Sequence, residues 1–154
     1  MAQTTIPGIN PCATAQLHIT LGETDGAAGN QYTPIVFTNG GPSTCTLDGH
    51  PGVSFVDAAG NQVGDSAHRN AGATPTVTLQ VGAQAHATID YHDPGFFDDC
   101  APAPTVSVKI YPPDQTEAIA LPFPSSLCTK PTSEPELTID TVRAGPTLAA
   151  GEPG

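Results

Sequence analysis

Basic and large aromatic side chains are scarce in this chain of 154 residues. It has no Trp, one Met, and only four Lys or Arg against 15 Asp or Glu, for a formal net charge of −11. Such a surface repels phosphate backbones and anionic headgroups, so we expect no nucleic-acid partner and no binding to acidic lipid. Because the only Met is Met1, a copper site built from Met and His is excluded as well.

Long apolar runs are also missing. No run of about 18 apolar residues occurs, so we expect no transmembrane segment. The first residues are polar and lack the apolar core of a signal peptide, and we expect an export segment to be absent from this sequence. The 16 Gly and 17 Pro favour turns over long helices, and we expect less than about a tenth of the residues to be helical.

Apolar residues instead recur at every second position, which is typical of strands with one buried face. Strands are predicted at 17–21, 32–38, 45–47, 53–57 with a hairpin to 62–63, 76–81, 85–91, 106–110, 116–121 and 137–142. Pro34 indicates an edge position or a bulge, and residues 22–29 predict a loop. Strands at this spacing predict an all-β two-sheet β-sandwich. We expect an exposed lead-in at 1–11, one domain at 12–142 and a flexible tail at 143–154.

The four cysteines, Cys12, Cys45, Cys100 and Cys128, contain no Cys-x-x-Cys pair. Zinc-ribbon and thioredoxin-type motifs are therefore excluded. Three disulfide pairings remain open. Disulfides indicate an exported protein, and the alternative is four buried free thiols in a cytosolic protein.

Several short motifs are distinctive in combination. They are Gly-Ala-Ala-Gly-Asn (26–30) with Tyr32, Ile-Val-Phe-Thr-Asn (35–39), Cys-Thr-Leu (45–47), Pro-Gly-Val (51–53), Ala67-x-Arg69 and Tyr-Pro-Pro (111–113). Together they resemble a family of secreted and lipoprotein domains of unknown function that is common in actinobacteria. The resemblance implies an exported, immunoglobulin-like sandwich with a Cys12–Cys45 disulfide, which leaves Cys100–Cys128 as the second pair. It implies no activity.

No residue pattern in the chain predicts chemistry. There is no Gly-x-Ser-x-Gly motif, so we assign no catalytic residue. His18 and His86 lie on the polar phase of their strands and are expected to face solvent. The loop acids Asp90, Asp93, Asp98 and Asp99 could attract calcium, but their spacing fits no calcium loop. We expect no metal and no cofactor.

One loop has no evident structural role in the sequence. Phe96 and Phe97 are adjacent in a Pro/Gly-flanked segment before Cys100. Either both rings are structural, one of them covering the Cys100–Cys128 bridge, or they form a contact surface for a partner. The predicted contact residues are Tyr91, His92, Asp93, Phe96, Phe97, Asp98 and Asp99.

These features predict a non-catalytic binding module outside the cytoplasm, secreted or anchored to the cell envelope. Its expected partner is a protein or small ligand that the sequence does not identify, and we expect a monomer. The alternative is a secreted hydrolase or metal-binding protein whose site the sequence does not reveal.

Overall fold

The structure is a computed structural model, and it describes residues 9–27, 29–72 and 74–146. In this part of the chain the only helices are two short 3-10 turns, η1 (Thr14–Gln16) and η2 (Pro94–Phe96). None of the described helices is long and apolar enough to cross a membrane. The expected all-β fold is confirmed.

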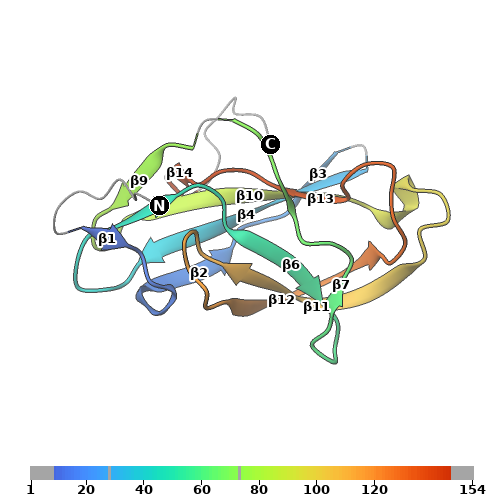
Figure 1. Cartoon of the computed structure of the whole chain (residues 1–154), viewed down its shortest axis with the longest axis horizontal. Coiled ribbons are helices and arrows are strands. Elements are labelled where there is room, and N and C mark those ends of the chain that lie inside the picture. Colours follow the sequence, from blue (N-terminus) through green and yellow to red (C-terminus); the bar gives the residue numbers. More distant parts are fainter. Residues whose placement is uncertain (1–8, 28, 73, 147–154) are drawn as a thin grey trace.

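The strands of the described residues form three hydrogen-bonded sheets (Figure 1). The largest contains β2 (Leu17–Leu21), β3 (Asp25–Ala27), β4 (Asn30–Asn39), β8 (His68–Arg69), β10 (Gln84–His92), β13 (Leu137–Ile139) and β14 (Arg143–Ala144). The second contains β6 (Gly52–Val56), β7 (Gln62–Val63), β11 (Pro102–Tyr111) and β12 (Ile119–Cys128). A small third sheet of β1 (Asn10–Pro11), β5 (Cys45–Asp48) and β9 (Thr76–Leu79) was not expected. It arises because β5 pairs with β1 and β9 rather than with either large sheet.

The core lies between the two large sheets. Alternating residues of β4 and β10 bring Ile35 opposite Ala87 and Phe37 opposite Ala85, and all four side chains are buried. Facing them, the second sheet contributes buried side chains such as Val53, Phe55, Val108 and Ile110. Burial of apolar area at about 25 cal/mol per Å² is the main force that holds such layers together.

An aromatic cluster joins the two sheets at one end of the core. The rings of Phe55, Tyr91 and Phe123 meet edge to face with centroids 5.5–5.9 Å apart. Tyr91 was predicted as a contact residue, but its side chain is buried among core residues. Its ring therefore stabilises the sandwich.

Pro34 lies in an interior strand, so of the two predicted alternatives, an edge position or a bulge, the edge position is wrong. β4 is flanked by β10 on one side and by β2 and β3 on the other. The irregularity falls in the neighbouring strand, because β2 ends at Leu21 and the N–H of Gly22 donates to the Pro34 carbonyl at 2.8 Å. A Cβ on Gly22 would lie 2.5 Å from Cγ of Pro34, so only glycine fits there without a shift. The predicted loop at 22–29 also contains the short strand β3.

Short described strands lie just outside the predicted domain limits of 12 and 142. β1 pairs with β5 at the start, and β14 pairs with β10 at the end. The rest of the predicted lead-in and tail, residues 1–8 and 147–154, lies outside the described residues.

The pairing of β14 corrects the expectation for His86, whose side chain is only 1% exposed. Its Nδ1 lies 2.8 Å from the carbonyl oxygen of Gly145, directly after β14. From the sequence we predict a flexible tail from residue 143 onward, so the sequence does not indicate that this segment covers His86. His18, by contrast, is exposed as expected.

Two disulfides, Cys12–Cys45 and Cys100–Cys128, account for all four cysteines, so the predicted pairing is confirmed. They close segments with sequence separations of 33 and 28 residues. Each closure stabilises the fold by about 3–4 kcal/mol through its restriction of the unfolded chain.

Candidate binding surface at the loop after strand β10

The loop that follows β10 is held by the sandwich at several points. The N–H of Asp93 donates to the Gly29 carbonyl at 2.9 Å, which ties the loop to the segment before β4. Within η2, the N–H of Phe96 donates to the Asp93 carbonyl at 2.9 Å. The loop is therefore fixed at its start by main-chain bonds.

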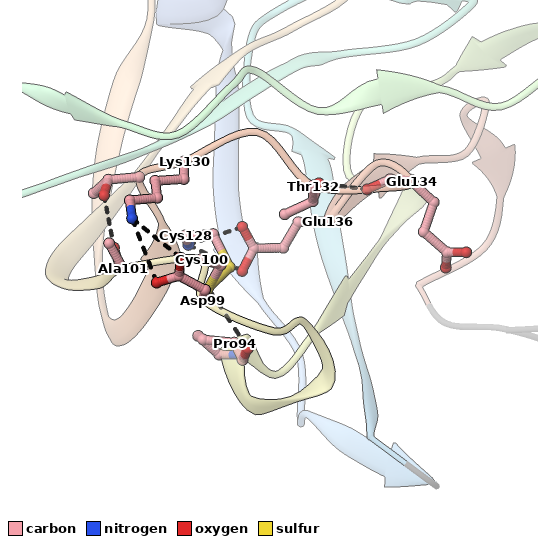
Figure 2. The surroundings of a disulfide bond; sticks show 10 residues. Pro94, Asp99, Cys100, Ala101, Cys128, Lys130, Thr132, Glu134 and Glu136 are labelled. Carbon is pink, nitrogen blue, oxygen red and sulfur yellow. Dashed lines mark hydrogen bonds and ion pairs between the residues drawn. A yellow bond between two sulfur atoms is a disulfide. The ribbon is translucent and has the colours of Figure 1, made fainter.

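The Cys100–Cys128 disulfide fixes the end of the same loop (Figure 2). The Cys100 carbonyl accepts hydrogen bonds from the N–H groups of Thr129 and Lys130, both at 3.0 Å. Asp99 and Ala101, on either side of Cys100, have φ angles of 50° and 52°, a region that non-glycine residues rarely occupy. The bridge and these bonds together hold this unusual backbone in place.

The two adjacent phenylalanines have different roles. Phe97 is only 9% exposed and packs with the two bridge cysteines as a small separate core. Phe96 is 53% exposed and is one of three large apolar side chains exposed in the described part of the chain. Its ring stacks on His92 with centroids 4.4 Å apart and an interplanar angle of 12°. Phe97 supports this stack edge to face, at 5.1 Å from Phe96.

Two glutamates from the segment before β13 surround the same histidine. Nε2 of His92 lies 3.0 Å from Oε1 of Glu134. Both carboxylate oxygens of Glu136 accept from the Cys128 N–H, at 2.9 and 3.1 Å (Figure 2). Burial raises the pKa of Glu136, while this hydrogen bond and the nearby His92 lower it in part. Burial also raises the pKa of Asp90, opposed by His92 and increased further by Asp140.

Several buried polar atoms along β10 and at the facing end of β4 have no hydrogen-bond partner among the described residues. Asn30 and His92 lie opposite each other on β4 and β10, and both Oδ1 of Asn30 and Nδ1 of His92 are of this kind. The same holds on β10 for one side-chain atom each of His86, Thr88 and Asp90. These atoms can each take one further hydrogen bond, from water or from a ligand.

A cleft of about 500 Å³ adjoins the surface and is lined by residues 64–66, His68 and 127–137. Its wall carries Asp65, Glu134 and Glu136 against a single lysine, Lys130. That lysine lies 3.4 Å from the exposed carboxylate of Asp99. The surroundings of the loop are therefore mainly acidic.

The comparisons with known proteins place this arrangement in a family. A family model described as "Domain of unknown function (DUF4232)" matches residues 12–145, which include both disulfides and the whole loop. The chain belongs to the DUF4232 family. No curated protein and no solved structure matched the chain significantly.

Of the predicted contact residues of this DUF4232 domain, the structure brings His92, Phe96 and Phe97 together. Asp93, Asp98 and Asp99 are exposed around them. In the described residues, no group of three or more His, Cys, Asp or Glu side chains is placed to hold a metal ion, so the loop acids do not converge as a calcium site would require.

Sequence reasoning missed Glu134, Glu136 and Asn30 as neighbours of the loop. Glu134 and Glu136 flank Pro135 just before a predicted strand, so their acidity was visible in the sequence. Only the pairing of β13 with β10 shows that they reach His92.

Proposed function

We propose that this DUF4232 domain is a non-catalytic binding module that acts outside the cytoplasm. Its contact surface, here called the Phe96 surface, consists of Phe96 and His92 with the exposed acids Asp93, Asp98 and Asp99. Phe97 supports this surface from beneath through edge contacts with both rings, whereas Tyr91 belongs to the core.

The observation that carries the proposal is the exposed ring of Phe96 in a loop that is already fixed. Phe96 is 53% exposed, and stacking on His92 sets the orientation of its ring. A rigid aromatic side chain loses little conformational freedom when a partner covers it, so more of the contact energy remains for affinity. Exposed aromatic residues of this kind are common binding hot spots.

The proposed location outside the cytoplasm rests on the two disulfides, which persist mainly in oxidising compartments. The resemblance of the motifs to secreted and lipoprotein domains supports the further proposal that the protein is secreted or lipid-anchored, in an actinobacterium.

The absence of enzymatic turnover is part of the same proposal. The recognisable motifs serve turns, strands and disulfides. The raised pKa values of Asp90 and Glu136 have burial as their main cause, which needs no catalytic role. This part is tested in a broad esterase, glycosidase and peptidase screen. It would be overturned by hydrolysis whose rate rises in proportion to purified protein and that H92Q abolishes.

The location of the surface is tested with a photo-reactive benzoylphenylalanine. It replaces Phe96 in one variant and Val81 in a matched control. Val81 is 58% exposed and lies before the other end of β10. In intact cells of the source organism we expect a discrete cross-linked product from position 96 and none from position 81. Equal products from both positions, or none from 96, would contradict the proposed surface.

A further inference from the structure

The edge strands of the sheets are not equally protected against pairing with another chain. Natural edges are commonly short, charged, or interrupted by proline. β1, β7, β8 and β14 have two residues each, β3 has three and includes an acid, and β12 contains Pro122 and Pro124. β9 follows Pro75, and its last carbonyl, that of Leu79, accepts a hydrogen bond from Nδ2 of Asn39 at 2.9 Å.

β2 has none of these protections. It is five residues long, contains no proline and no Asp, Glu, Lys or Arg, and pairs with β4 without a bulge. Figure 1 shows β2 on the side of β4 away from β10, and no other described strand pairs with it. It is the longest unprotected edge strand in the described part of the chain.

The hydrogen-bond pattern shows which backbone groups of β2 point away from the sheet. At the two ends of the ladder, the Gly40 N–H donates to the Gln16 carbonyl and the Gly22 N–H donates to the Pro34 carbonyl. Such bonds alternate along antiparallel strands, so the backbone groups of the even-numbered residues bond to β4. The backbone N–H and C=O groups of Leu17, Ile19 and Leu21 therefore point away from β4. The Leu17 N–H donates to the Thr14 carbonyl. This leaves the Leu17 carbonyl, and the N–H and C=O of both Ile19 and Leu21, without a described partner.

We propose that β2 is a pairing edge for a second copy of this chain. The two β2 strands run antiparallel about a two-fold axis at Ile19, so that their largest sheets become continuous. The outward groups of Ile19 then bond to those of Ile19 in the second copy, and the Leu17 carbonyl accepts from the Leu21 N–H.

Side chains agree with this self-pairing. In the two-fold register, Leu17 lies opposite Leu21 of the second copy on the core side, where both are half-buried. On the other side, exposed His18 lies opposite exposed Thr20. Continuing the same register, the acids Glu23 and Asp25 fall opposite Ala15 and Ala13 of the second copy. No two acids meet along this line, although each chain carries a net charge of −11.

This inference is independent of the proposed function. β2 pairs with residues 35–39 of β4, whereas the Phe96 surface lies beyond the opposite end of that strand, at Asn30. The proposed pairing replaces the expectation of a monomer with that of a weak homodimer. Because both copies are acidic, salt is expected to strengthen the association by screening their repulsion.

The test is a charge exchange at the two exposed positions of β2, followed by sedimentation equilibrium. The wild type is expected to form a species of twice 15.6 kDa. The double variant H18K/T20K places Lys opposite Lys in the dimer and is expected to raise Kd about tenfold, and H18E/T20E likewise. An equimolar mixture of the two variants should restore the wild-type Kd, because Lys then faces Glu at both positions.

The matched control is T76K/T78K, which adds the same charges to two exposed threonines of the β9 edge. It is expected to leave Kd within about twofold of the wild type, since neither position lies at the proposed interface. A wild type that remains at 15.6 kDa up to roughly 1 mM would overturn the self-pairing. That result is also the one expected if β2 receives a strand from a different protein. A dimer that H18K/T20K does not weaken, or that the mixture does not restore, would overturn the proposal as well.

Discussion

Substitution of the two adjacent phenylalanines is expected to separate a structural ring from a contact ring. Phe97 is 9% exposed and packs on the Cys100–Cys128 bridge, so F97A removes a buried ring beside a bridge that cannot move to fill the space. Loss of a buried phenylalanine costs about 3–5 kcal/mol in protein cores, and we expect about 3 kcal/mol for this peripheral cluster. At about 2–4 °C per kcal/mol for a domain of this size, Tm should fall by about 6–12 °C.

F96A is expected to lower the free energy of unfolding much less, because Phe96 is already 53% exposed. The partial burial and the stack on His92 amount to about 1 kcal/mol, or about 2–4 °C in Tm. Scanning calorimetry and urea unfolding measure both losses, with F96L and F97L as size controls. If F96A lowered Tm as much as F97A, the exposed ring would be part of the core and the assignment of roles would be wrong.

The remaining predictions concern the backbone, the bridge and the half-buried Glu136. G22A places a Cβ 2.5 Å from the Pro34 ring and is expected to cost about 1–3 kcal/mol, whereas G95A has nothing within 4 Å and should be near neutral; equal urea midpoints would contradict this. The double variant C100S/C128S is expected to lower the free energy of unfolding by about 3.5 kcal/mol. The Asp93 and Phe96 amides should then no longer exchange their hydrogens slowly. Burial raises the pKa of Glu136 above 4.5, so the folded state holds this proton more tightly and gains stability at low pH that is lost as pH rises through the folded pKa. The unfolding free energy of the wild type minus that of E136Q should therefore fall as pH rises above 4.5, and a rising difference would contradict the assignment.

Much of the fold could be predicted because alternation of apolar residues is a local signal. Strands such as β2, β9 and β10 follow this pattern in their sequences. Val106 shows where the signal fails. A register shift between Thr105 and Ser107 reverses the phase of β11, so Thr105 is buried and Val106 is exposed. A bulge of this kind depends on pairing with β12, which the local sequence does not encode.

The candidate site was predicted less completely, because its parts come from distant segments. The loop itself was identified from its adjacent phenylalanines. The difference between Phe96 and Phe97 depends on the return of β12 to Cys128, and the carboxylates near His92 depend on the placement of β13 beside β10. Sequence spacing alone does not fix such pairings.

The energetic role of Phe96 in partner binding is the most direct test of the proposed function. A photo-reactive benzoylphenylalanine is placed at exposed Asp98 in the same loop, and its cross-linking yield in intact cells is compared with and without F96A. If Phe96 is the central contact, its loss should weaken binding by at least about 1.4 kcal/mol. The cross-linking yield should then fall about tenfold at concentrations well below Kd. The matched background V81A should leave the yield unchanged. A yield that F96A does not alter would show that the partner, if it binds at this loop, does not use the exposed ring, and the account of the Phe96 surface would be wrong.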